Sequence, residues 1–211
     1  MLLYALRYSG FGFSLIVVIF AGANPLFADD KNVFALGRVG LNISELSGQG
    51  DGFGVSPELS IGGEYLAHRY FAIDLYLGYL QARLPLATGL IRADFFKSAL
   101  YFVGRYPMKI FIPYVFLGGY ANVHFSSEYE EASTGTIYDR ASSFNPAHFG
   151  LSGGLGLQMH IWLIDVFADV MYSWGINNSI KEVQSSILTL QPAPDYSVQI
   201  YLGAKYAVYK I

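Results

Sequence analysis

The chain has 211 residues, enough for one domain, and no Cys, which excludes disulfides, thiolate metal sites and a lipoprotein-type anchor. Hydrophobic residues make up 53% and charged residues only 14%, against roughly 25% charged in soluble domains. The formal net charge of −3 supplies no basic field, so we expect no nucleic-acid partner.

The N-terminus has the order of a secretory signal. A basic residue without neighbouring acids precedes an apolar run at 11–23, and small residues follow. We predict a signal peptide over residues 1–28, cleaved after Ala23 or Ala28, and a barrel domain over 29–211. A retained membrane helix is the alternative, disfavoured because the run is shorter than the roughly 20 residues of a span.

After residue 28, eight segments alternate apolar side chains with polar or small ones. Because successive strand side chains point to opposite faces, each segment predicts a strand with one apolar face. The expected strands are 33–44, 55–67, 71–82, 93–105, 111–125, 148–160, 164–174 and 197–208. We expect short turns after the second, fourth and sixth strands. Longer loops are expected at 46–54, 83–90, 126–147 and 175–195.

The strand at 93–105 is apolar on both faces, so energy decides its register. A Lys that faces lipid near the midplane of the bilayer costs roughly 2–4 kcal/mol. We therefore predict that Lys97 points inward with Ala99, Tyr101 and Val103.

The last strand, 197–208, predicts how the sheet ends. A terminal amphipathic strand leaves an unpaired edge, and pairing with the first strand would close a barrel. Short turns that alternate with long loops, and an even number of strands, are typical of outer-membrane barrels. A soluble barrel such as a lipocalin would show the opposite pattern, apolar inside and polar outside. The predicted fold class is all-β, an eight-stranded antiparallel up-and-down transmembrane β-barrel.

Three segments resemble the small eight-stranded outer-membrane β-barrel proteins, the OmpA/OmpX-like superfamily. They are Pro-Tyr-Val-Phe-Leu-Gly-Gly-Tyr at 113–120, Gly-Gly-Leu-Gly-Leu at 153–157, and the last strand with Gly203, Tyr206 and Val208. The last is similar to the terminal insertion signal of that family, but it continues for three residues and lacks a terminal Phe. The resemblance implies an integral protein of the bacterial outer membrane with both termini in the periplasm. It also implies a monomer surrounded by outer-membrane lipid and lipopolysaccharide, with the barrel-assembly machinery as partner during insertion.

The predicted inward faces carry charges of both signs in a lumen just wide enough for side chains. These charges are Arg38, Glu58, Glu64, Asp74, Lys97, Asp165, Asp169 and Lys205. Unpaired buried charges cost several kcal/mol, so we expect ion pairs between adjacent strands. The expected pairs are Arg38 with Glu64, Lys97 with Asp74, and Lys205 with Asp165 or Asp169. We interpret the set as a salt-bridged plug, and the alternative is a proton or ion path.

One arrangement has the residues of a catalytic site. His124 and Ser126 are two residues apart, so both would point the same way at the end of a strand, with Glu128 two residues further. The order His-x-Ser is similar to the outer-membrane lipid A deacylases, which continue with Asn late in the chain. The corresponding strand here, at 170–177, has no His. We expect no enzymatic activity. Because no carboxylate–histidine cluster has the spacing of metal ligands, we also expect no metal or cofactor.

Four cations near the predicted long loops could contact lipopolysaccharide phosphates or could be solvated loop charges. They are Arg83, Arg92, Arg140 and Lys181. The predicted function is a non-enzymatic structural or surface-interaction role through the extracellular loops. The alternatives are a narrow porin-like channel or hydrophobic-ligand conduit, and a lipid A-modifying barrel enzyme.

Overall fold

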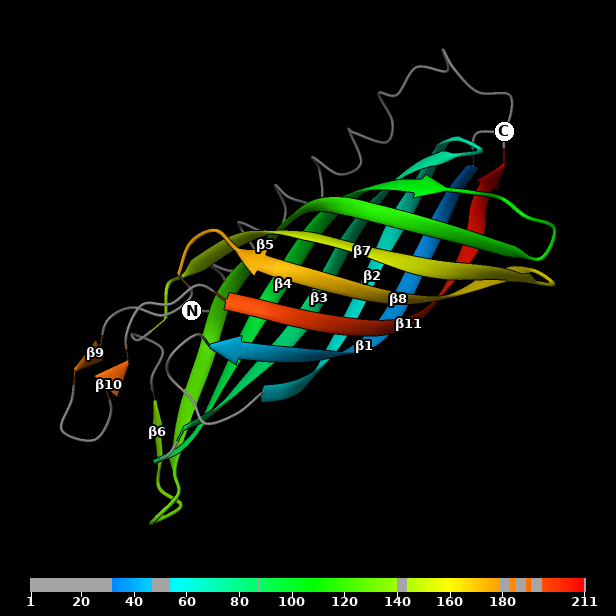
Figure 1. Cartoon of the computed structure of the whole chain (residues 1–211). Helices are drawn as coiled ribbons and strands as arrows, with labels where there is room; N and C mark the ends of the chain where they lie inside the picture. Colours follow the sequence, from blue (N-terminus) through cyan, green and yellow to red (C-terminus); the bar gives the residue numbers. More distant parts are fainter. Residues whose placement is uncertain are drawn as a thin grey trace.

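The computed structural model describes residues 32–46, 54–86, 88–139, 144–178, 183–184, 189–190 and 195–210. Eight long antiparallel strands close into a barrel, which confirms the predicted fold class (Figure 1). They are β1 (Asn32–Leu46), β2 (Gly54–His68), β3 (Phe71–Leu86), β4 (Gly89–Arg105), β5 (Phe111–Glu131), β7 (Ala147–Ile161), β8 (Ile164–Gly175) and β11 (Asp195–Lys210). No helix formed by the described residues is long and apolar enough to cross a membrane. The predicted signal peptide lies outside the described residues.

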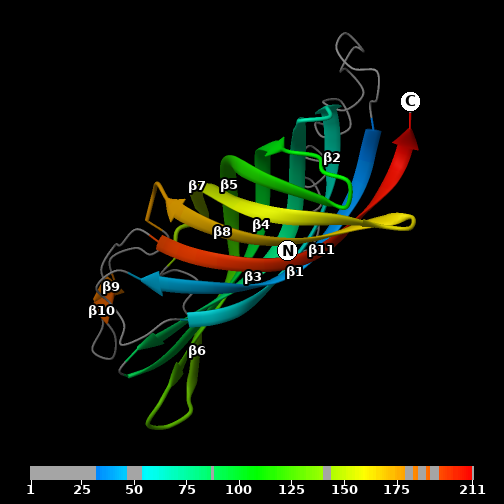
Figure 2. The same ribbon diagram turned by 45° about the vertical axis from the view of Figure 1, so that its right-hand side comes forward.

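The first and last strands close the barrel, as predicted. β1 pairs with β2 on one side and with β11 on the other, so Arg38 lies opposite Ser60 and Gly203. Figure 2 shows β1 in blue beside β11 in red. The β4–β5 and β5–β7 pairings complete the circuit. Every long strand therefore has two hydrogen-bonded neighbours, and closure removes the long exposed edges.

The two ends of the barrel differ in the length of their connections. At one end, called here the turn end, the connections are residues 69–70, 106–110 and 162–163, and the outer ends of β1 and β11 pair with each other. The opposite end is called here the loop end. There the sequence prediction of a loop at 83–90 is wrong, because β3 runs to Leu86 and β4 begins at Gly89.

The predicted start of the loop at 126–147 is also wrong, because β5 continues to Glu131 and pairs with β6 (Ile137–Asp139). The parts of β3, β4 and β5 beyond the barrel, together with β6, form one projection at the lower left of Figure 1, called here the extension. An apolar cluster holds it together: Leu80, Ile91, Ala93, Phe95, Tyr129 and Phe144. Two further short strands, β9 (Val183–Gln184) and β10 (Thr189–Leu190), pair with each other.

Apolar side chains cover the outside of the barrel and alternate with buried ones along each strand. In β4, Lys97 is buried, whereas Phe96, Leu100 and Phe102 are exposed on the outer face. This confirms the register that the cost of a lipid-facing Lys predicted. In β8 the same alternation exposes Val170, Tyr172 and Trp174. A continuous apolar exterior on a closed sheet is the surface that a lipid bilayer solvates.

Glycines on the inner face make room for large rings from neighbouring strands. A Cβ atom added to Gly40 would lie 2.3 Å from the ring of Tyr201, and one on Gly203 would lie 2.2 Å from the ring of Phe167. A Cβ atom added to Gly154 would lie 2.7 Å from the ring of Phe116. The lumen is therefore filled by aromatic rings that fit because the opposing residue has no side chain.

Candidate functional site: the lumen of the barrel

All eight charged side chains that were predicted to point inward are buried in the lumen: Arg38, Glu58, Glu64, Asp74, Lys97, Asp165, Asp169 and Lys205. Arg105, whose side chain is 7% exposed, joins them. Within the described strands the lumen thus holds cations and acids in nearly equal number, and all of them except Asp74 belong to three groups that follow one another from the loop end to the turn end. Asp74 accepts a hydrogen bond from the Tyr76 hydroxyl at 3.4 Å. A balanced set of charges is suited to mutual pairing and not to selecting ions of one sign.

The group nearest the loop end is built around Lys97. Its Nζ lies 3.0 Å from Oε1 and 3.2 Å from Oε2 of Glu58, and it donates to Oε1 of Gln199 at 3.0 Å. The hydroxyl of Tyr201 donates to the same Gln199 oxygen at 2.7 Å. Every hydrogen of the ammonium group therefore has an acceptor nearby, which is what a buried charge requires.

The middle group is centred on Arg38. Its guanidinium carbon lies 3.8 Å from the ring centroid of Tyr76 and 3.9 Å from that of Tyr201, so the cation is held between two aromatic faces. Nη1 of Arg38 lies 3.9 Å from Oδ2 of Asp169, which also accepts a hydrogen bond from Tyr114 at its other oxygen. The delocalised, weakly hydrated guanidinium suits such a stacked site better than an ammonium group would.

The group at the turn end is built around Glu64. Both of its oxygens lie 2.8 Å from Nζ of Lys205, and Oε1 lies 3.3 Å from Nη1 of Arg105. Arg105 also donates to Oε1 of Gln158 at 3.2 Å, and Gln158 donates to Asp165 at 2.8 Å. One carboxylate thus holds two cations, and the amide relays the network to the next acid.

The structure pairs the charges differently from the sequence prediction. Lys97 binds Glu58 instead of Asp74, Lys205 binds Glu64 instead of Asp165 or Asp169, and Arg38 lies near Asp169 instead of Glu64. Each of these three contacts joins strands that are separated by one intervening strand. The reason is the shape of the barrel: inward side chains converge on the axis, and the direct neighbours of the cations are often small, such as Gly78 beside Lys97.

Sequence reasoning missed several members of the network. Arg105 follows Lys97 by eight residues, so the same alternation places it inward, and this signal was present. The amides of Gln158 and Gln199, and the hydroxyl of Tyr201, carried no signal, because an uncharged polar side chain on an inner face can meet many partners.

A small pocket near the turn end is lined by charged and aromatic side chains, among them Glu64, Asp74, Arg105 and Lys205, and about 10 Å³ of it can hold the centre of a water molecule. That is roughly the room for one water. No group of three His, Asp or Glu side chains among the described residues could hold a metal ion.

The predicted pair His124 and Ser126 does not form a catalytic arrangement. A β-bulge at Phe125 places His124 opposite Phe95 and Ser126 opposite Asp94. Because Phe95 and Asp94 are consecutive in β4, their side chains lie on opposite faces of the sheet. His124 therefore follows Phe95 to the inner side, where its ring stacks on Phe144 at 4.9 Å, whereas Ser126 faces outward.

Two of the four cations predicted near the loops lie on the outer face of the extension. Nη2 of Arg92 contacts Oε2 of Glu130 at 2.8 Å, and Nε of Arg83 donates to Oε1 of Gln81 at 3.0 Å. Arg140 and Lys181 lie outside the described residues.

Neither a family model nor a curated protein sequence matches the chain. Solved structures do match in fold. Neisserial surface protein A superposes with a TM-score of 0.58 at 10% identity, covering 85% of this chain and 99% of that one. A major outer membrane protein from Thermus thermophilus gives 0.52 at 15%, covering 85% and 100%. The outer membrane protein AlkL, solved in lipid bilayers, gives 0.50 at 14%, covering 88% and 93%.

The barrel and its matches define a class. The chain has the fold of the small eight-stranded outer-membrane β-barrels, as the sequence resemblance implied. Identities of 10 to 15% carry the fold alone.

Proposed function

We propose that this protein is an integral barrel of the bacterial outer membrane that neither conducts nor catalyses, and that acts at the cell surface through the extension. In this proposal the turn end faces the periplasm. The observation that carries it is the lumen network, which occupies the interior from Lys97 to Lys205 with paired charges. A pore would need a continuous water-filled path along the same axis.

The extension supports the surface role. It projects beyond the barrel on three long strands and has its own apolar cluster, so it is a folded part of the protein. Its outer face is charged, with Arg92, Glu128 and Glu130 side by side on β4 and β5. Binding residues are found disproportionately on surface segments that a rigid scaffold positions, so this charged projection supports a binding role.

Planar-bilayer recording tests the plug. We expect the purified protein to give no current steps. Replacing both Glu58 and Lys97 by Ala should produce small steps, because the pair that crosses the lumen is removed and its volume is left to water. A control variant with Arg92 and Glu130 replaced, a pair on the outer face, should remain silent. Conductance in the unchanged protein would favour the channel alternative.

Mass spectrometry of lipid A tests the absence of catalysis. We expect identical lipid A from cells with and without the protein. Complementation then tests the surface role. A variant in which tight turns replace residues 82–93 and 127–139 should insert normally but should not correct the defect of cells that lack the protein. Full restoration by that variant would contradict a role for the extension.

A further inference from the structure

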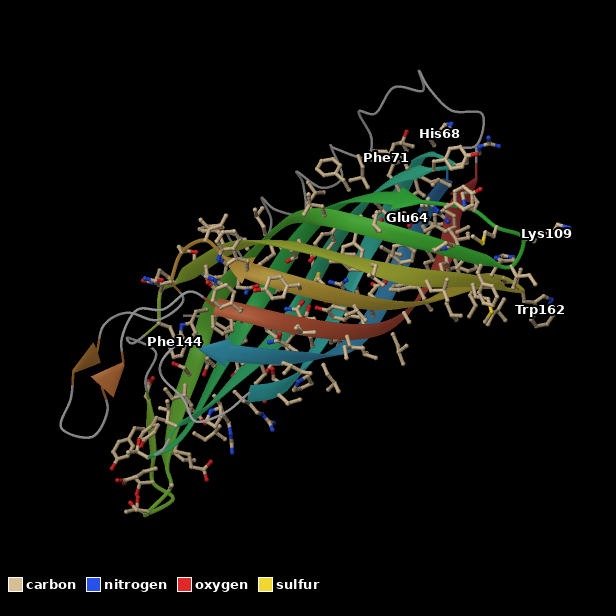
Figure 3. All side chains as sticks on the ribbon, in the orientation of Figure 1. Glu64, His68, Phe71, Lys109, Phe144 and Trp162 are labelled. Carbon is tan, nitrogen blue, oxygen red and sulfur yellow. The ribbon has the colours of Figure 1, made fainter. Side chains whose placement is uncertain are left out.

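The outer face of the extension carries a row of four charged side chains, called here the charge row. Arg83 of β3 lies directly opposite Arg92 of β4, and Arg92 lies opposite Glu128 of β5. Glu128 lies in turn opposite Asp139 of β6. In Figure 3 the extension, at the lower left, lies at the opposite end of the barrel from Lys109, and side chains with nitrogen and oxygen tips project from it.

The charge row faces outward along its whole length. The side chains of Arg83, Glu128 and Asp139 are exposed, and that of Arg92 is 42% exposed. Their immediate neighbours along the strands belong to the apolar cluster of the extension or pack against it: Ala82, Ile91, Tyr129 and Tyr138. A folded core therefore fixes the four charges on one flat surface, about 14 Å across at roughly 4.8 Å per strand.

The order of the charges is the unusual feature of this surface. Two cations form one half of the row and two acids form the other, so like charges lie directly opposite each other on β3–β4 and on β5–β6. Such pairs destabilise a sheet, whereas an alternating order would let every charge pair with its direct neighbour. Contacts within the chain relieve this only in part. Arg92 pairs with Glu130 at 2.8 Å, and Nε of Arg83 donates to the uncharged side chain of Gln81 at 3.0 Å.

Two-fold symmetry makes the charge row complementary to itself. Two copies that stand upright in one membrane are related by an axis along the membrane normal, and this axis crosses the row. If it passes between β4 and β5, Arg83 of one copy faces Asp139 of the other, and Arg92 faces Glu128. Copies in two opposed membranes are related by an axis in the membrane plane, which places like charges against each other. The order of the charges therefore selects a partner in the same membrane.

A second copy also satisfies both halves of the row at once. An anionic ligand would be attracted by the two arginines and repelled by the two acids a few ångströms away, and a cationic ligand would meet the opposite conflict. Exposed ion pairs are individually weak. Two proteins that are already held upright in one membrane, however, lose less freedom of motion on association than two proteins in solution.

We propose that the outer face of the extension is the interface of a homodimer, in which the charge rows of two copies in one membrane pair with each other. This differs from the monomer that the sequence resemblance implied. The inference rests on the upright membrane placement of the proposed function, and it is independent of whether the lumen conducts.

Cross-linking tests the dimer, because the chain has no Cys and a single one can be introduced. Ser126 faces outward on β5 beside Asp94 of β4, next to the expected axis. In outer membranes that contain the Ser126→Cys variant, a bismaleimide that spans about 10 Å, the distance between packed sheets, should give a covalent dimer. Ile176→Cys, exposed at the loop end beyond β8, is the matched control and should stay monomeric. Absence of a dimer for Ser126→Cys would overturn the proposal.

Charge reversal tests which contacts hold the dimer. Added to Ser126→Cys, the pair Arg83→Glu and Arg92→Glu makes the row wholly acidic. The pair Glu128→Arg and Asp139→Arg makes it wholly basic. Each reversed row repels a second copy of itself, so cross-linking should fall several-fold for either variant alone. When one cell produces both variants, an acidic row faces a basic one and mixed dimers should form. A variant that only misfolds is not rescued by this mixing.

Ionic strength and a distant charge complete the test. Raising the salt concentration from about 0.15 M to about 1 M shortens the screening length from about 8 Å to about 3 Å, and it should lower the cross-linking of Ser126→Cys. Adding Arg69→Glu, at the turn end, should leave cross-linking unchanged. Cross-linking that persists in both reversed variants, or that does not return in the mixture, would overturn the dimer. Such a result would leave the surface role standing, because complementation tests that role separately.

Discussion

At the level of single residues, the surroundings of Gly203 show how closely the lumen is packed. A Cβ atom there would lie 2.2 Å from Cζ of Phe167 and 2.7 Å from the carbonyl oxygen of Gly37. We expect Gly203→Ala to lower the free energy of unfolding by roughly 1–3 kcal/mol, because the ring and the neighbouring strand must move. Urea unfolding in detergent, followed by the gel mobility of the folded barrel, measures the change.

Gly37→Ala is the matched control. Gly37 lies on β1, next to β11 in the sheet, and a Cβ atom added there meets nothing within 4 Å. Its effect should stay within about 0.5 kcal/mol. Equal losses for the two substitutions would mean that glycine acts here through backbone flexibility and not through space for the Phe167 ring.

The same residues show what alternation can and cannot predict. Period two decides the face of every residue on a regular strand, so the inward position of Lys97 followed from the cost of placing it in lipid. Alternation gives no information about distances across the lumen. It therefore did not predict that Lys97 binds Glu58, which lies on the far side of β3. It also fails wherever a bulge adds a residue, and Phe125 separated His124 from Ser126 in this way.

The extension shows the corresponding limit at the level of elements. Pro85 and Gly89 read locally as turn signals, yet β3 and β4 remain paired up to Leu86 and Gly89. The contacts that maintain this pairing come from distant segments: the Tyr129 hydroxyl donates to the carbonyl of Thr88 at 2.8 Å, and Phe144 is buried against Phe95. Tertiary packing of this kind has no local signature in the sequence.

Phe144 should therefore control the order of the extension. We expect Phe144→Ala to remove roughly 3–5 kcal/mol of local packing, so that a glutamate-specific protease cleaves the folded protein faster after Glu128 and Glu131. Unfolding of the barrel should change less than this cleavage rate, since the ring packs on Phe95 and His124 only at the loop end of the barrel. Ile137→Ala, on the exposed side of β6, should leave the cleavage rate unaltered. If both variants are cleaved alike, Phe144 does not hold the extension.

For the molecule as a whole, the closed barrel separates an apolar exterior from a charged interior. The exterior faces hydrocarbon with exposed aliphatic side chains, and the interior pairs charges of opposite sign with one another. Composition and alternation were enough to predict this inversion, since each inward charge would cost several kcal/mol on the lipid face. The height of the barrel in the bilayer was not predictable, because strand tilt and the length of the extension depend on the assembled sheet.

An arginine scan along the outer face of β11 locates the bilayer. Leu202 is near the middle of this strand and Val208 is near its turn-end limit, and both side chains are exposed. We expect Leu202→Arg to destabilise the reconstituted barrel by roughly 2–4 kcal/mol and Val208→Arg by about 0–1 kcal/mol, because the cost of a lipid-facing cation falls from the midplane to the interface. Unfolding in vesicles by denaturant measures both. A cost that does not decrease from Leu202 to Val208 would show that the membrane lies elsewhere on the barrel.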